Sequence, residues 1–437
     1  MIRALVLIVL AAALPARAAT DIQVVTSPGG ITAWLVEEQS IPMIALEVSF
    51  RGGTSLDPVG KEGVTYLMAG LIEEGAGDMD AAGFLKATEA LAARFNYRAY
   101  RDTVSISAEV LKENAGEALD LLRTAITSPN FDDVAVERVR AQVLSSLQSN
   151  QTDPDEIAGE ALRRLSFPGH PYATLDEGSV DSVTALTRDD IVAAHRAALV
   201  KSRMFVGVVG AVTAEELGPM LDRLLGDLPE DGPPLPEPTA MALEGGTTVI
   251  ELNAPQSVAL FAQPGIDRND PDYFAAYLLN EILGGSGFES RLMREVREER
   301  GLTYGVYSFL APFDHASQII GNVASANDRI AEAIEVVRAE WQRIADEGVT
   351  EDELNAAKLF VTGAYPLRFD GNSNIASILV GLQVADLGKD YPLTRNARME
   401  AVTIEDVNAM AKRLIRPEDL HVIVVGQPEG LTATAVQ

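Results

Sequence analysis

The two halves of this chain end in the same pattern, and this internal repeat constrains the fold more than any other feature. Residues 186–210 read LTRDDIVAAHRAALVKSRMFVGVVG, and residues 402–426 read VTIEDVNAMAKRLIRPEDLHVIVVG. Three residues of the first copy recur 216 positions later in the second: Thr187 as Thr403, Asp190 as Asp406 and Gly210 as Gly426. Each copy predicts a threonine-capped amphipathic helix and then a short apolar strand. The constant offset indicates a duplicated domain.

A proline-rich stretch, LPEDGPPLPEPTAMALEGG at 228–246, separates the two halves. Its prolines exclude a helix, and its glycines and acidic residues favour an exposed segment. The chain has 437 residues, which is too many for one ordinary core and about right for two domains. We therefore predict an N-terminal domain at 19–227, a linker at 228–246 and a C-terminal domain at 247–437.

Strands and helices alternate within each half. Period-two alternation predicts a strand in IPMIALEVSFRGGTSLD, with its apolar side at Ile44, Leu46, Val48 and Phe50. Other segments predict a strand at 257–265, a strand followed by a helix across 103–127, and long helices at about 132–150 and 351–364. Strands that pair within each half, with helices stacked on one face, give an α+β domain twice over, each with a mixed or antiparallel sheet.

The first 18 residues, MIRALVLIVLAAALPARA, have the features of a signal peptide. Arg3 supplies the positive start, residues 4–14 an apolar run, and Ala16–Ala18 a small-x-small cleavage site. The alternative is an uncleaved anchor, but the run is short for a bilayer, and no later stretch reaches membrane-spanning length. The sequence contains no cysteine, which excludes disulfides, thiolate zinc sites and a cysteine nucleophile. We expect a protein exported to a bacterial periplasm.

The charge balance is strongly acidic. The chain has 64 acidic and 35 basic residues, a net charge of −29. Such a surface repels nucleic acid and anionic lipid, so we expect neither as a partner. It suits basic peptides or basic protein partners, and equally a simply solvated surface.

One segment of the first half has the form of a metal-binding helix without its ligands. The stretch GKEGVTYLMAGLIEEGAG, at 60–77, resembles the His-x-x-Glu-His segment of M16 peptidases, the pitrilysin, insulinase and mitochondrial-processing type. Alignment on Gly63 and Gly75 places Tyr66 at the first His, Ala69 at the Glu and Gly70 at the second His. Two histidines four apart on a helix can share a zinc ion, and the glutamate can take a proton from its bound water.

A catalytic zinc also needs a third protein ligand. In the family it is a glutamate on a later helix, which ERVRAQVL from Glu137 resembles, and Leu144 takes the ligand position. The resemblance therefore implies that this chain holds no zinc and does not hydrolyse peptides alone. Glu73, Glu74 and Glu137 could hold a hard cation, although solvated or structural roles are expected. The four histidines lack ligand spacing and are expected at the surface or as caps: His170, His195, His315 and His421.

The second half keeps a denser resemblance. The stretch LLNEILGGSGFESRLMREVREERGLTYGVYSF, at 278–309, is similar to the most recognisable segment of the M16 C-terminal domain. The family's Arg and Tyr, which contact the substrate backbone and support the oxyanion, correspond to Arg297 and Tyr304. The alternative is that Arg297 belongs to a solvated helix face with ion pairs one turn apart.

The resemblance covers nearly the whole chain after residue 18 and is to the short, two-domain branch of M16. It implies the LuxS/MPP-like metallohydrolase fold in two copies, and a dimer in which one subunit holds zinc and the other supplies the Arg/Tyr pair. The expected function is a non-catalytic subunit of an exported heterodimeric zinc endopeptidase. Its partner would carry the intact His-x-x-Glu-His and the zinc, and peptides would be the substrates. The alternatives are a non-enzymatic scaffold or peptide-binding protein, and a peptidase with a relocated metal site.

Overall fold

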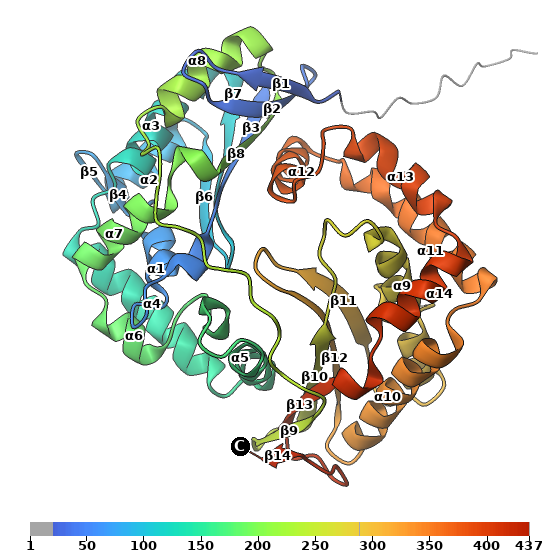
Figure 1. The fold of residues 1–437 in the computed structure, drawn as a ribbon. Helices are drawn as coiled ribbons and strands as arrows, with labels where there is room; N and C mark the ends of the chain where they lie inside the picture. The colour runs from blue at the N-terminus through green and yellow to red at the C-terminus, as the bar shows by residue number, and fades with distance from the viewer. Residues whose placement is uncertain (1–20, 288, 437) are drawn as a thin grey trace, which may run out of the picture.

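A computed structural model describes residues 21–287 and 289–436. The predicted signal peptide at 1–18 lies outside these residues. The two halves each form a sheet with helices on its outer side, and the two sheets face each other across the molecule (Figure 1). The predicted α+β class and the duplication are confirmed.

The two sheets have the same topology except at one edge strand. The first has the order β1-β2-β8-β3-β7-β6 and the second β11-β12-β10-β13-β9-β14. The first sheet consists of β1 (Gln23–Thr26), β2 (Thr32–Glu37), β3 (Met43–Arg51), β6 (Arg94–Ala99), β7 (Thr103–Leu111) and β8 (Met204–Gly210). The second consists of β9 (Gly246–Glu251), β10 (Gln256–Pro264), β11 (Val306–Pro312), β12 (Ser317–Ala326), β13 (His421–Gly426) and β14 (Ala435–Val436). Both sheets have a parallel pair at the same place, β2 with β8 and β9 with β13, and an antiparallel strand lies beside β8 and β13. On the other side of the pair, β1 is antiparallel to β2, whereas β14 is parallel to β9. A small hairpin pairs β4 (Gly75–Ala76) with β5 (Met79–Asp80).

The helices follow the same division. The first half contains α1 (Val64–Leu71), α2 (Ala81–Ala90), α3 (Ala115–Thr127), α4 (Asp133–Asn150), α5 (Pro154–Ser166), α6 (Val180–Ala185), α7 (Arg188–Ala198) and α8 (Ala214–Leu225). The second contains α9 (Tyr273–Gly284), α10 (Ile330–Glu347), α11 (Glu351–Ala364), α12 (Asn372–Val384), α13 (Tyr391–Ala401) and α14 (Ile404–Leu414). In the described part of the chain, none of them combines the length and apolar character needed to cross a bilayer.

The repeated residues have the same structural role in both halves. Thr187 with Asp190, and Thr403 with Asp406, form complete capping boxes at the starts of α7 and α14. The glycine that ends each following strand has a positive φ, 141° at Gly210 and 146° at Gly426. A Cβ at Gly210 would lie 2.1 Å from a carbonyl oxygen of β3, so only glycine fits. The repeat therefore preserves a cap and a strand ending.

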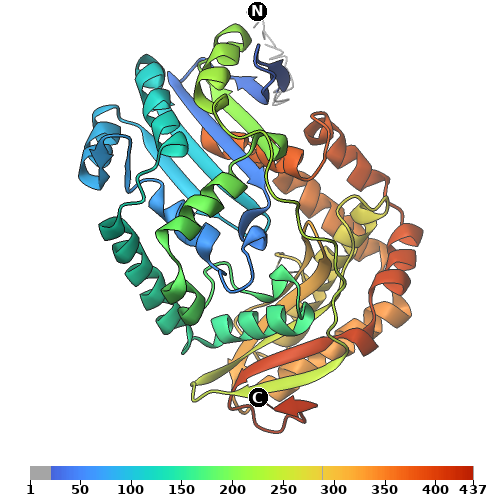
Figure 2. The same cartoon turned by 60° about the vertical axis from the view of Figure 1, so that its left-hand side comes forward.

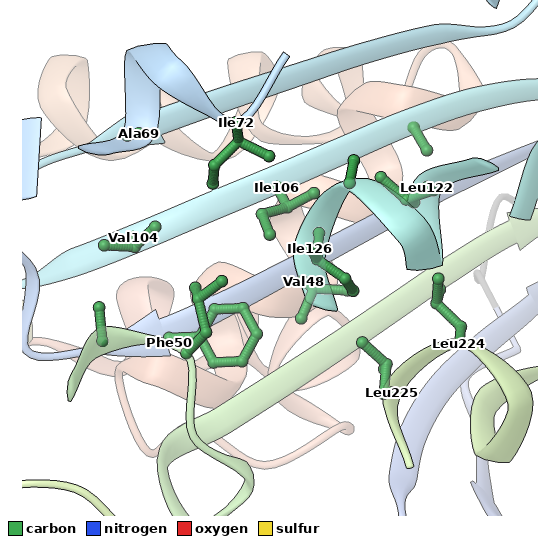
Figure 3. Close-up of a cluster of buried hydrophobic side chains, with 14 of the residues drawn as sticks. Val48, Phe50, Ala69, Ile72, Val104, Ile106, Leu122, Ile126, Leu224 and Leu225 are labelled. Carbon is green, nitrogen blue, oxygen red and sulfur yellow. The ribbon is translucent and has the colours of Figure 1, made fainter. Parts of the chain in front are cut away.

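The core of the first half lies between the sheet and its outer helices (Figure 3). Val48 and Phe50 of β3 and Ile106 of β7 point toward Leu122 of α3 and Leu225 of α8. The apolar positions predicted on β3 are buried, as the alternation indicated. A corresponding core lies under α9, α10 and α14 in the second half.

The inner face of each sheet is covered by a helix from the other half, which the expectation of helices on one face missed. Helix α5 packs on β10 and β13, and α12 packs on β3 and β8 (Figure 1). The apolar contacts under α5 join Ala158, Ala161 and Leu162 to Ala262, Ile423 and Val425. Those under α12 join Ala376 and Leu379 to Ile22, Ala45 and Val209. The two halves are therefore joined by a reciprocal pair of helices.

The segment between α8 and β9 contains no helix or strand and passes between the halves (Figure 2). Ala242 N donates to Ser166 O at 2.8 Å, and Thr239 N donates to His315 O at 2.7 Å. The predicted linker is thus mostly exposed but fastened to both halves.

Replacing Gly207 of β8 by Ala should destabilise the chain, because α12 lies directly over it. The new Cβ would be 2.6 Å from Ala376 O and 3.1 Å from Leu379 Cβ. We expect a loss of about 1–3 kcal/mol in the free energy of unfolding, measured by urea titration. The control is Gly381→Ala on α12, which meets nothing within 4 Å and should stabilise the helix by about 0.5–1 kcal/mol. Equal stability of Gly207→Ala and the unaltered chain would contradict this packing of α12.

Candidate functional site

Helix α1 carries three of the degenerate positions, and its start is fixed by the half-buried carboxylate of Asp57. Asp57 accepts hydrogen bonds from Gly63 N at 2.8 Å, Thr65 N at 3.2 Å and Thr65 Oγ1 at 2.5 Å. Gly63 has φ 88°, and a Cβ there would lie 2.2 Å from Glu177 O. Burial raises the pKa of Asp57 to about 7. This role could not be predicted from the sequence, because Asp57 lies too far before the helix for a local cap pattern.

Helix α4 packs against α1. A Cβ at Gly70 would lie 3.5 Å from Val139 Cγ1, and Glu74 forms an ion pair with Arg138. Buried Arg140 fixes α4 by donating to Val183 O and Leu186 O, both at 2.8 Å.

A cavity of about 510 Å³ opens between α1, α4 and β6. Tyr66, Ala69 and Gly70 all line it, so the structure brings three of the four predicted positions together. The side of α4 that lines it consists of Val139, Gln142, Val143 and Ser146.

The fourth position, Leu144, is a correction. It does not line this cavity and packs instead against the core of the first half. Two residues along a helix turn the side chain by about 200°, so Leu144 and Ser146 face opposite sides of α4. Ser146 therefore lies on the side of α4 that faces Tyr66 and Gly70.

The residues of this cavity do not fit a zinc ion. The positions in question offer a phenol, a methyl group, a hydrogen and a hydroxyl, and burial, with Glu177 and Asp176 nearby, raises the pKa of the Tyr66 phenol. Across residues 21–287 and 289–436, no group of three or more His, Cys, Asp or Glu is arranged to hold a metal. Glu74 pairs with Arg138, and Glu137 pairs with Arg140 at 3.4 Å.

Two of the four histidines differ from the expectation. His170 caps a short 3₁₀ turn by accepting from Tyr172 N at 3.1 Å, as predicted for a capping residue. His315 and His421 are buried, so a surface place is wrong for both. His421 is held by Glu244 O at 2.6 Å and Thr248 Oγ1 at 2.9 Å. These contacts give it a structural role.

The segment with Arg297 and Tyr304 leads into β11, the edge strand of the second sheet. Arg297 lies on a π-helical turn, Met293–Glu298, is half-buried, and already has an interaction within the chain. Tyr304 is 90 % exposed. The loop between them is fixed by Thr303 Oγ1, which donates to Ala324 O at 2.7 Å. Neither residue lines the cavity beside Tyr66.

Comparison with known families settles the relationship. Residues 34–174 match the family described as "Insulinase (Peptidase family M16)", and residues 185–360 match "Peptidase M16 inactive domain". The chain belongs to the M16 peptidase family. Both M16 matches fall on the parts of the chain that carry the two resembling segments.

Individual M16 relatives agree over nearly the full length. The chain is 26 % identical to the "Non-peptidase homolog YmxG" of Helicobacter pylori over 89 % of this chain and 90 % of the relative. It is 22 % identical to the "Mitochondrial-processing peptidase subunit beta" of Saccharomyces cerevisiae over 91 % and 90 %. A crystal structure of the "peptidase M16 inactive domain" from Pseudomonas fluorescens has a TM-score of 0.87 and 27 % identity, covering 95 % of this chain and all of that one. Together with the missing donors, these comparisons support an inactive, non-peptidase member of M16.

A second cavity of this chain lies on the inner face of the first sheet, under α12. It measures about 430 Å³, and Glu47, Ser49 and Arg98 of the sheet and Ser377 of α12 are among its lining. Burial raises the pKa of Glu47 to about 7, although the Ser377 hydrogen bond and the Arg98 charge oppose this. The alternation in β3 predicted its apolar side, but it did not predict that Glu47, on the other side, would be covered as well.

Replacing Glu47 by Gln should stabilise the chain at high pH only. Because the folded-state pKa is above the unfolded one, ionised Glu47 destabilises the folded state increasingly as pH rises from about 4.5 to about 7. Relative to the unaltered chain, Glu47→Gln should therefore be more stable by about 2 kcal/mol at pH 8 than at pH 4.5. Urea unfolding at both values measures it. Glu113→Gln, at an exposed position, reports the general effect of removing one acidic charge, and an equal response of both variants would contradict the prediction.

Proposed function

We propose that this chain is the non-catalytic subunit of an exported heterodimeric M16 zinc endopeptidase. The observation that carries the proposal is a contrast between the halves. In the first half a cavity beside α1 is present, but Tyr66, Ala69 and Gly70 stand at the positions of the two histidines and the glutamate. In the second half, Arg297 and Tyr304 are retained. A subunit needs the fold for assembly, and needs no zinc of its own if the partner holds it.

Arg297 and Tyr304 complete the active site of the partner in this proposal. A guanidinium presents forked donors to a peptide carbonyl, and a phenol adds one more. Donors aimed at the oxygen where charge develops stabilise the transition state for amide hydrolysis. The 90 % exposure of Tyr304 leaves its hydroxyl accessible to a second chain. The zinc, and the general base, belong to the partner's intact His-x-x-Glu-His.

The compartment in this proposal is the periplasm. The signal-peptide pattern at residues 1–18 and the absence of cysteine from the sequence support it. The substrates are peptides, or unfolded segments, that can enter between two subunits. A relative named as one subunit of a processing peptidase supports a two-subunit arrangement.

Reconstitution tests the proposal. The mature chain is mixed with an exported M16 chain from the same organism that carries His-x-x-Glu-His, and the mixture is separated by size-exclusion chromatography. Cleavage of a fluorogenic peptide library should require both chains and should stop on zinc chelation. Full activity of the partner alone would overturn the proposal.

A second candidate is a non-enzymatic scaffold or peptide-binding protein. The misfit of the cavity to zinc and the relative named a non-peptidase homologue favour it. A stable homodimer that binds peptides, and that does not raise the cleavage rate of any M16 partner, would decide for this candidate.

A further inference from the structure

A cavity unrelated to the degenerate zinc position lies behind α12 in the second half. It measures about 460 Å³ and opens between α9, α12, α13 and the 3₁₀ turn Tyr365–Arg368 that follows α11. That volume is in the range of small-molecule sites. Its apolar lining includes Ile378, Leu382 and Met399.

Aromatic and cationic side chains make up much of the remaining wall. Four tyrosines line the cavity: Tyr273, Tyr277, Tyr365 and Tyr391. Three arginines join them: Arg268, Arg368 and Arg395. The guanidinium carbon of Arg268 lies 4.2 Å from the ring centre of Tyr273, and that of Arg395 lies 4.3 Å from the ring centre of Tyr365. The aromatic faces therefore hold two of the guanidinium groups in place.

None of these three arginines has a carboxylate partner among the described residues. Arg268 donates to Tyr391 Oη at 2.8 Å. Arg395, which is 6 % exposed, donates from Nη1 to Val361 O at 3.1 Å and Asn396 Oδ1 at 2.9 Å. A guanidinium has five N–H donors, so Nε and Nη2 of Arg395 still have donors to offer.

The three arginines lack a carboxylate partner in the described part of a chain that is rich in acidic residues. Acidic residues outnumber basic ones by 64 to 35. Some arginines of the second half pair with carboxylates, as Arg291 does with Glu353 at 2.7 Å, while others, such as Arg338, donate to backbone carbonyls instead. A buried cation without a counter-ion is unfavourable. Three cationic groups around one cavity therefore leave a positive potential inside an acidic protein.

We propose that this cavity binds a small organic anion, a carboxylate or a phosphate monoester with an aromatic or apolar body. The acid group pairs with Arg268, Arg368 and Arg395, for which the planar fork of the guanidinium is suited. The body of the ligand packs against the tyrosine rings and Ile378, Leu382 and Met399. Arg368 is exposed at the opening, and Arg395 lies deepest. The site is independent of Arg297 and Tyr304 and of any partner subunit.

Calorimetric titration of the mature chain at low salt tests this site. The probes are phenyl phosphate and phenylacetate, with benzyl alcohol as the neutral analogue and benzylamine as the cationic one. At least one anion should bind one-to-one, more than tenfold tighter than either analogue, and more weakly as salt rises. If only one of the two anions binds, the result shows whether the site takes a phosphate or a carboxylate.

Variants of the arginines decide where the anion binds. Arg268→Gln and Arg368→Gln should each weaken anion binding about tenfold or more, which is the loss of one charge-assisted hydrogen bond. Arg368 is exposed, so its replacement should leave the fold intact even if Arg395→Gln does not. The matched control is Arg416→Gln, whose side chain is exposed and pairs with Asp419 at 3.6 Å; its affinity should stay within twofold. No anion binding at millimolar concentration, equal binding of benzyl alcohol, or unchanged affinity in both variants would overturn the proposal.

Discussion

Peptide cleavage by the reconstituted complex should fall about 100-fold or more in kcat when Arg297 is replaced by Ala. A donor that acts only on the developing oxyanion contributes to the transition state and little to substrate binding, so KM should change far less than kcat. Tyr304→Phe removes one hydroxyl donor and should cost about 10- to 100-fold for the same reason. Both are measured with saturating partner and a fluorogenic peptide.

Two neighbouring variants separate chemistry from structure. Arg294→Ala removes an arginine from the same turn, which pairs with Glu295 at 3.6 Å. Tyr307→Phe removes a hydroxyl three residues beyond Tyr304, on β11, where the ring is 41 % exposed. Both should leave kcat within about twofold. The proposed role fails if Arg297→Ala and Tyr304→Phe form the complex and cleave at the unaltered rate, or if their loss follows from failed assembly.

The duplication and the α+β class of both halves could be predicted because their signals are local. A capping box and a strand-ending glycine need only a few residues, so Thr187, Asp190 and Gly210 identified their copies 216 residues later. The exchange of α5 and α12 could not be predicted in this way. Their apolar stripes show that a face is buried, but periodicity does not say which surface buries it. Here the surfaces belong to the opposite sheets.

Only part of the candidate site could be predicted, for a similar reason. Tyr66, Ala69 and Gly70 lie within one helical turn, so a motif places them together. Leu144 was placed by aligning α4 with the family helix that carries the third ligand, although no ligand residue matched. That alignment was off by two residues, so the predicted position lies on the wrong side of the helix. Asp57 and Glu47 belong to no sequence motif. Their roles could not be predicted, because their burial depends on α1 and α12 packing over them.

Zinc binding should appear when three groups are restored on the faces that line the cavity. Tyr66→His and Gly70→His place two imidazoles four residues apart on α1, and Ser146→Glu adds a carboxylate from α4. Gly70 accepts a side chain, because its Cβ would meet only Val139 Cγ1 at 3.5 Å, an ordinary contact. We expect one zinc per chain in a competition titration with a chromogenic chelator.

The matched variant carries Tyr66→His and Gly70→His with Leu144→Glu in place of Ser146→Glu. Leu144 packs against the core on the other side of α4, so its carboxylate cannot complete the site. Loss of groups that only orient a ligand costs 10- to 100-fold in metal affinity, so loss of a ligand should cost at least about 100-fold. The Ser146→Glu triple variant should therefore bind zinc at least that much tighter than the Leu144→Glu one.

Equal affinities would show that α4 does not face α1 through Ser146. A tighter Leu144→Glu variant would restore Leu144 as the ligand position. The expected order would confirm that the cavity keeps the geometry of a zinc site and lacks only its ligands.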